Sequence, residues 1–224
     1  MLVKALRVLN LIYMMFNSCF TLTVILESDH INWTGYKKVK ENFPNIKILG
    51  NNDVNENLKK RNLPPLDIVF SDNFQFQIGD TKITTIQNYH GEGEDYAETH
   101  GLIMETPKQN LIFATDLSTL VDYETYLLTN NLKLDIILLE ANYDPKVIEF
   151  YESTKAHTGF NIFANGSYRH LSTTDREIFV DKFGKSDTID VELHQSETYR
   201  TFDGLIKKSK GKITQRDIDN WLVR

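Results

Sequence analysis

Residues 134–140 read LDIILLE, an almost continuous apolar run that ends in a carboxylate. A run of this length is typical of a strand that is buried on both faces, as in a parallel sheet. Asp144-Pro145 follows it and combines an N-cap residue with a proline at the first helical position, which predicts a helix through about Thr154. A buried strand followed directly by a helix indicates an α/β arrangement in this part of the chain.

The segments on either side extend this pattern. Thr34 is the predicted N-cap of a helix over 36–42, Gly79-Asp80 predicts a hairpin turn, and Ser172 with Asp175 predicts a helix that Gly184 closes. The other predicted helices are 55–61, 122–129 and 213–221. The other predicted strands are 21–26, 46–49, a meander of 68–70, 74–78 and 82–89, then 101–105, 110–114 and 188–193. Strands first, then alternating strands and helices, predict two sheets sandwiched between outer helices.

The composition bounds the function. The chain has 224 residues, of which 41% are hydrophobic and 25% charged, so it suits one globular domain and excludes intrinsic disorder as the main state. No repeat or linker appears, and we expect a single domain over 1–224. The net charge of −6 argues against binding nucleic acid by bulk charge alone. The single cysteine, Cys19, excludes a disulfide framework and a cysteine-rich zinc site, so a metal must be held by histidines and carboxylates.

Residues 1–26 are atypical. Lys4 and Arg7 precede an interrupted apolar stretch, 9–26, which has the order of a signal peptide but no small-residue cleavage site. We expect instead a short helix over 3–11 and a buried strand over 21–26, and hence a cytoplasmic protein without a membrane anchor. A secreted or anchored hydrolase is the alternative, and sequencing the N-terminus of the mature protein would test it.

Polar side chains follow the ends of apolar strands at several places along the chain. They are Asp29, His30, His90, Asp116, Glu140 and His194, with His170 just before a helix start. Taken singly, each has a structural explanation: a strand-end histidine is commonly a hydrogen-bonded structural residue, and Asp116 would suit a turn. Taken together, neutral imidazoles and hard carboxylates form the ligand mix of Zn²⁺, Mn²⁺ or Fe.

In order and spacing these segments resemble the metallo-β-lactamase-fold hydrolases, on their ribonuclease Z and exonuclease side. The similar segments are Ser28-Asp29-His30, Asn88-Tyr89-His90-Gly91, Ala114-Thr115-Asp116, 138–144, Arg169-His170-Leu171-Ser172 and Leu193-His194-Gln195-Ser196. The resemblance covers about residues 20–200. It implies a four-layer αββα sandwich, here with an incomplete N-terminal pair of strands.

The resemblance also implies a site and a reaction. Two divalent metal ions, zinc first with manganese or iron as alternatives, would be held by Asp29, His30, His90, Asp116 and His194. Asp29, Glu140 and His170 would be catalytic, with Asp29 orienting the attacking water, His170 protonating the leaving oxygen and Glu140 tuning it. The implied function is a metal-dependent phosphodiesterase or nuclease that acts on a nucleic acid or a small phosphodiester. A β-lactamase or a thioesterase activity stays open as an alternative, and so does assembly as a homodimer.

The first family motif, His-x-His-x-Asp-His, is only half present. Ile25 and Glu27 stand where the family has its two leading histidines, so one metal site is expected to be weak or empty. One hypothesis is that residues 12–27 are a frame-shifted reading of an ordinary member, which the coding DNA would test. The alternative function is a non-catalytic, degenerate domain with an incomplete metal site.

Several other residues have weaker predicted roles. His100 and His157 match no motif and are expected to be solvated. Candidate phosphate contacts are Lys155, Arg169 and Arg200. Trp33 and Tyr89 would suit base stacking, although buried packing is the commoner role of such side chains.

Overall fold

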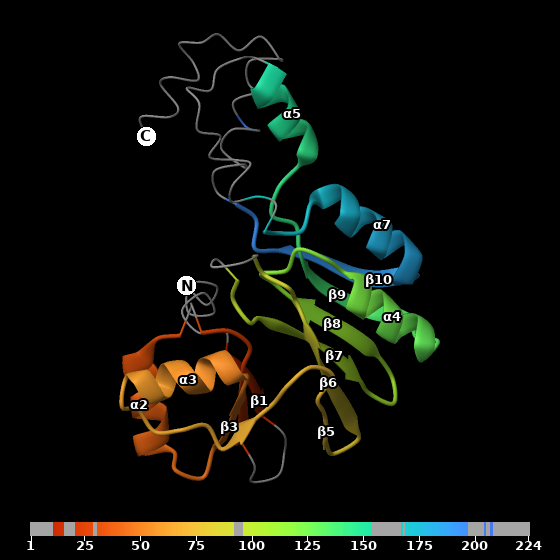
Figure 1. The fold of residues 1–224 in the computed structure, drawn as a ribbon. Coiled ribbons are helices and arrows are strands. Elements are labelled where there is room, and N and C mark those ends of the chain that lie inside the picture. Colours follow the sequence, from red (N-terminus) through yellow and green to blue (C-terminus); the bar gives the residue numbers. More distant parts are fainter. Residues whose placement is uncertain are drawn as a thin grey trace. The chain divides into compact units, whose positions relative to one another are not determined.

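The structure, a computed structural model, describes residues 11–15, 21–28, 31–91, 96–153, 167, 169–196, 204 and 207. The chain falls into two compact units, residues 1–107 and 108–224 (Figure 1). A single domain over 1–224 therefore stays a prediction. Among the described residues, no helix is both long and apolar enough to cross a membrane.

A four-stranded sheet forms the first part of the first unit. Its strands, in spatial order, are β1 (Leu11–Met15), β2 (Thr21–Ile25), β3 (Lys47–Gly50) and β4 (Ile68–Val69). β1 pairs antiparallel with β2, whereas β2 with β3 and β3 with β4 are parallel. The predictions for β2 and β3 are confirmed to within a residue. β1 was not predicted, because the apolar stretch that contains it lacks the alternation of a strand.

Two helices accompany this sheet, α2 (Trp33–Asn42) and α3 (Asn52–Lys60). They bury Tyr36, Val54 and Leu58 in one core with strand residues such as Ile48. The predicted N-cap Thr34 is wrong. Asn32 caps α2, its Oδ1 accepting from the backbone N–H of Gly35 at 2.9 Å, because asparagine is the better N-cap and the apolar face begins at Trp33.

Three antiparallel strands complete the first unit: β5 (Gln75–Ile78), β6 (Thr81–Gln87) and β7 (His100–Glu105). The predicted hairpin turn is confirmed, with Gly79 at φ 56°. The predicted meander is wrong in its first strand, since Ile68 and Val69 belong to β4 and pair with β3. Asp67 holds residues 68–69 against β3, because its Oδ2 accepts from the Ile48 N–H at 2.9 Å and its own N–H donates to the Ile48 carbonyl.

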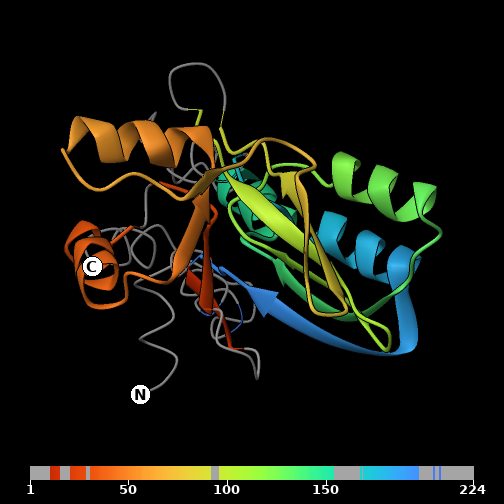
Figure 2. The same ribbon diagram turned by 90° about the horizontal axis from the view of Figure 1, so that it is seen from below.

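Parallel strands form the centre of the second unit: β8 (Asn110–Ala114), β9 (Leu134–Glu140) and β10 (Gly184–Leu193), with β9 between the other two. Two helices, α4 (Val121–Thr129) and α7 (Thr173–Phe183), lie side by side over these strands, and Lys182 reaches Glu124 across them at 2.6 Å (Figure 2). Helix α5 (Pro145–Ser153) follows β9 as predicted.

The parallel register places the carboxyl ends of the three strands at one edge. Ala114 pairs with Leu139 and Leu193 pairs with Glu140. The predicted start and stop of α7 are confirmed, with Ser172 Oγ accepting from the Asp175 N–H at 3.0 Å and Gly184 as C-cap. The predicted helix over 213–221 and residues 3–10 of the predicted N-terminal helix lie outside the described residues.

Candidate metal centre

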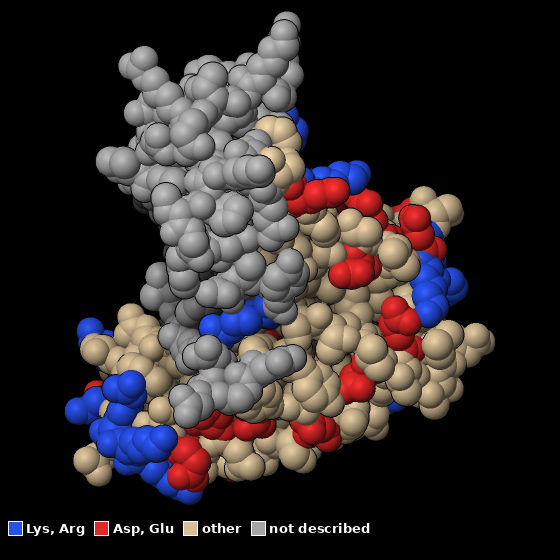
Figure 3. All heavy atoms as spheres, turned by 45° about the horizontal axis from the view of Figure 1, so that its top comes forward, with Lys and Arg blue, Asp and Glu red and all other residues tan. Residues whose placement is uncertain are grey.

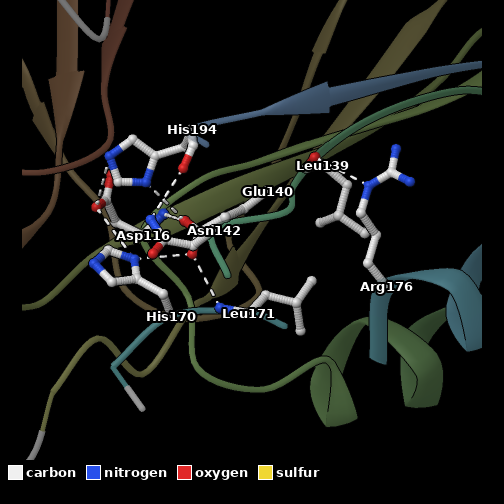
Figure 4. A network of polar contacts seen from close by, with 8 residues as sticks. All are labelled: Asp116, Leu139, Glu140, Asn142, His170, Leu171, Arg176 and His194. Atoms are coloured by element: carbon white, nitrogen blue, oxygen red, sulfur yellow. Dashed lines mark hydrogen bonds and ion pairs between the residues drawn. The ribbon is translucent and has the colours of Figure 1, made fainter. Parts of the chain in front are cut away.

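Four predicted site residues meet at the carboxyl edge of the second unit. Asp116, Glu140, His170 and His194 each offer a ligand atom, and these atoms lie within 4.8 Å of one another (Figure 4). Asp116 follows β8, Glu140 ends β9, His194 follows β10, and His170 precedes the N-cap of α7. Residues up to 78 positions apart in the sequence, from Asp116 to His194, are thus collected by the ends of parallel elements.

The backbone is left-handed at two of these four residues. Among the described residues, positive φ outside glycine occurs at Asn62, Asn73, Asn131, Tyr89, Asp116 and His194. Asparagine, aspartate and histidine adopt the left-handed region more readily than most residues, so five of these six positions carry a suitable residue. Tyr89, which directly precedes the predicted ligand His90, is the exception, and unfavourable backbone conformations gather at functional sites.

Glu140 is the centre of the hydrogen-bond network (Figure 4). Its side chain is completely buried. Oε1 accepts from His170 Nδ1 at 2.8 Å and from the Leu171 N–H at 3.0 Å. Oε2 accepts from His194 Nδ1 at 3.0 Å and from the Asp116 N–H. Two bonds to each oxygen use the acceptor sites of a carboxylate, so Glu140 orients the other three residues and has no acceptor site left for a metal.

These contacts also set the charge of Glu140. Burial by itself raises the pKa of the carboxyl. The hydrogen bonds and the charges of His170 and His194 lower the pKa by more than burial raises it, so it lies below its ordinary value. Glu140 is therefore ionised near neutral pH, and the atoms that face it must be donors. Both imidazoles accordingly carry a hydrogen on Nδ1, which leaves each Nε2 available to a metal or a substrate.

The spacing of the remaining donor atoms fits a metal ion. His194 Nε2 lies 3.6 Å from Asp116 Oδ1. Two ligand atoms on one tetrahedral zinc ion lie about 3.4 Å apart, given bond lengths of about 2.0–2.2 Å. His170 instead presents Nδ1 to Asp116, at 4.0 Å, and that atom is already bonded to Glu140. The spacing of His194 Nε2 and Asp116 Oδ1 is thus compatible with a shared metal ion, and His170 stands beside this pair.

Two residues that the sequence analysis did not single out hold the site together. Arg176 of α7 is 3% exposed and donates from Nε to the Leu139 carbonyl (Figure 4). It also makes a two-pronged ion pair with Asp190 of β10. It joins the elements that carry His170, Glu140 and His194. Asn142 donates from Nδ2 to the His194 carbonyl at 3.0 Å, which supports the left-handed turn there. Arg176 lies three and seven positions before the buried Phe179 and Phe183, and this helical spacing is the sequence signal that places it on the inner face of α7.

The other predicted ligands belong to the first unit. His90 is buried, 8% exposed, and its backbone forms an isolated bridge with Ala97. Asp29 and His30 lie outside the described residues. The roles of all three as ligands stay predictions. His157, Lys155 and Arg200 also lie outside the described part of the chain.

The prediction that His100 is solvated is wrong. Its side chain is completely buried, with Nε2 3.1 Å from Asp72 Oδ1 and Nδ1 3.3 Å from the Asn51 amide nitrogen. Burial lowers its pKa, and Asp72 opposes that shift without cancelling it. His100 thus acts as a structural residue between β7, the α3 N-cap and the loop at Asp72, a role that its isolated position in the sequence did not reveal.

Ile25 and Glu27, which stand at the two leading positions of the first motif, are both buried. Ile25 is 1% exposed and packs in the core of the first unit with Tyr36 and Leu58. Glu27 is 3% exposed. Trp33 packs against the same core, and the Arg61 guanidinium lies 4.5 Å above its ring, so packing is confirmed for this residue. Tyr89 is 41% exposed, which contradicts buried packing there.

Comparisons with solved structures identify the fold. The metallo-β-lactamase-fold protein YhfI from Bacillus subtilis is similar with a TM-score of 0.55 and 12% identity, over 84% of this chain and 69% of that one. The short form of human tRNase Z gives 0.53 and 12%, over 84% and 86%. A diphosphatase of the PhnP family gives 0.51 and 16%, over 78% and 59%. No protein-family model and no curated protein matches the sequence. The chain has the metallo-β-lactamase fold, which confirms the predicted fold class.

Proposed function

We propose that this chain is a metal-dependent hydrolase of phosphodiester bonds. The observation that carries the proposal is the buried Glu140 carboxylate, which orients two histidines at once and fixes the protonated nitrogen of each. A metal-ligating histidine almost always donates its second ring N–H to a carboxylate, a carbonyl or a water. Here one buried carboxylate accepts from both rings. That similar folds include a tRNase Z and a diphosphatase supports a phosphate ester as substrate.

His194 and Asp116 would hold a metal from the second unit, and Asp29, His30 and His90 would complete the set of ligands. A divalent metal, when bound, lowers the pKa of its water and polarises the phosphate. Asp116 would suit a position shared by two ions, because a carboxylate offers two oxygens. Its buried, left-handed backbone holds that carboxylate at the strand edge. Asp29 would orient the attacking water.

His170 would donate a proton to the leaving oxygen. Its Nδ1–H is bonded to the ionised Glu140, which fixes the orientation of the ring and turns Nε2 away from the carboxylate. The ring is 17% exposed and its centroid lies 5.1 Å from that of His194, so it stands at the edge of the ligand pair with access from outside. A proton donor needs that access, whereas a buried structural histidine does not.

A second candidate is a non-catalytic domain with an incomplete metal site. The observation that favours it is Ile25, an apolar core residue at a position where the family has a ligand. Such a chain would bind one metal ion weakly and would not turn over substrate.

Metal content and turnover on two substrates separate these candidates. The proposal expects one tightly bound equivalent of zinc or manganese per chain and a second, weaker one by mass spectrometry of the metal, and hydrolysis of bis-p-nitrophenyl phosphate. His170→Asn should lower turnover about 10²-fold on an alkyl phosphodiester, whose leaving group needs a proton. It should change turnover far less on the nitrophenyl ester, whose leaving group does not. Less than one equivalent of metal and no hydrolysis would establish the non-catalytic candidate.

A further inference from the structure

We propose that the basic residues of α2, α3 and β3 bind the phosphodiester backbone of a polynucleotide. We call this set the basic surface. It consists of Lys37, Lys38, Lys40, Lys47, Lys59, Lys60 and Arg61. The proposal rests on the proposed function and deepens it, because it names a polynucleotide rather than a small phosphodiester as the substrate class.

The charge of the chain is unevenly distributed along its length. Residues 33–67 contain seven lysines and arginines against four acidic residues, a net charge of +3. The rest of the chain has 18 against 27, a net charge of −9. The basic side chains gather at the lower left of Figure 3, where α2 and α3 lie in Figure 1. A positive region on an acidic protein directs a polyanion to one place and repels it elsewhere.

The fold gathers residues of this surface that are distant in the sequence. Arg61, just after α3, stacks 4.5 Å above the ring of Trp33 at the start of α2. Lys40 and Lys47 both approach Asp67, at 2.5 and 3.4 Å, which joins the end of α2 to β3. The stacked guanidinium is held in one orientation, and a planar fork of donors suits phosphate oxygens.

Most of these cations are accessible to a partner. The side chains of Lys37, Lys47 and Lys59 are 58–62% exposed. Their ion pairs with Glu41, Asp67 and Glu56 are surface pairs, which are worth little and exchange readily for a phosphate. Lys38 and Lys60 are also exposed, and within the described part of the chain neither makes an ion pair.

Salt dependence follows from the number of phosphates contacted. Four contacts to a single strand predict a slope of about −2.8 in log affinity against log salt, or about a 50-fold loss between 50 and 200 mM. Four contacts to a duplex predict a steeper slope of about −3.6. Recognition of phosphate alone predicts binding without sequence preference, and RNA and DNA strands of equal length should both bind.

The test compares two charge reversals in the full chain. Lys38→Glu with Lys60→Glu alters the basic surface. Lys133→Glu with Lys185→Glu is the matched control in the second unit, with the same change of −4 in net charge. Binding of fluorescein-labelled RNA and DNA 20-mers is measured by anisotropy in EDTA over a salt series. Hydrolysis of bis-p-nitrophenyl phosphate with metal is measured in parallel. Circular dichroism and melting confirm folding, and Lys38→Gln with Lys60→Gln repeats the test without new acids.

The proposal expects at least a tenfold loss of binding in Lys38→Glu with Lys60→Glu, a smaller loss in the glutamine pair, and a shallower salt slope in both. The control should stay within twofold of the wild type, and nitrophenyl ester turnover should be unchanged. Equal losses in both reversals would overturn it, because bulk charge would then explain them. Failure of the wild type to bind either 20-mer would also overturn the proposal, and the basic surface would then be assigned to an acidic protein partner instead. Basic-surface binding without any ester hydrolysis would support this surface and refute the proposed function.

Discussion

Glu140→Gln is the sharpest perturbation of the candidate metal centre. Glu140 accepts four hydrogen bonds, two on each oxygen, from His170, Leu171, His194 and Asp116. Glutamine has the same shape, but its NH₂ group must face one of the two donor pairs. Two buried donors then lose their acceptor, and the bonds on the other oxygen lose their charge. At about 1–3 kcal/mol for each unsatisfied buried group, the cost is about 2–6 kcal/mol of unfolding free energy.

The same substitution should weaken the metal site. A histidine whose Nδ1 no longer donates to a carboxylate loses its fixed tautomer, so we expect zinc affinity to fall about 10–100-fold. Urea unfolding of the metal-free chain measures the stability, and competition with a chromogenic chelator measures the affinity. Glu105→Gln is the matched control, because Glu105 also ends a strand and pairs with Lys82 at 3.0 Å, but at the surface. That control should cost less than about 1 kcal/mol.

The pH dependence gives an independent check on Glu140. Because its folded pKa lies below the unfolded value, its ionised form contributes stability that is complete above about pH 4.5 and lost as the pH falls through the folded pKa. The difference in unfolding free energy between wild type and Glu140→Gln should therefore shrink below about pH 4. A difference under about 0.5 kcal/mol at pH 7, together with unchanged zinc affinity, would refute the central role given to this carboxylate.

Three further substitutions test other parts of the structure. Asp116→Asn keeps a residue that tolerates the left-handed backbone, so the melting temperature of the metal-free chain should change little. The substitution removes the carboxylate, so tight metal binding in a chelator assay should be lost. A metal stoichiometry equal to that of the wild type would exclude Asp116 as a ligand. Arg176→Met should lower the free energy of unfolding in urea by about 3 kcal/mol. This is the lower end for breaking a buried ion pair, because Asp190 is partly exposed. An unchanged stability would contradict the role of Arg176 in joining α7 to β9 and β10. His100 is held neutral by burial, so the wild type should lose stability relative to His100→Gln as the pH falls below about 6.5; parallel pH curves for the two proteins would count against this explanation.

Local signals in the sequence were enough to predict most of the helices and strands and the strand-end residues of the candidate metal centre. The apolar run 134–140, the N-cap Ser172 and the turn glycine Gly79 each act through neighbouring residues, so their strand, helix and hairpin were predicted correctly. The strand-end positions of Asp116, Glu140 and His194 were also readable, because the carboxyl ends of parallel strands meet at one edge. The order of the segments, compared with a known family, was enough to predict the fold class.

What depends on distant contacts was decided by the tertiary structure. Asp67 assigns residues 68–69 to β4 through Ile48, which lies far away in the sequence. Burial makes His100 a structural residue, although its neighbours in the sequence suggested a solvated one. The role of Glu140 as a shared acceptor was visible only once both histidines were in place. Periodicity and capping depend on residues a few positions apart, whereas pairing, burial and hydrogen-bond saturation depend on which segments the whole fold brings into contact.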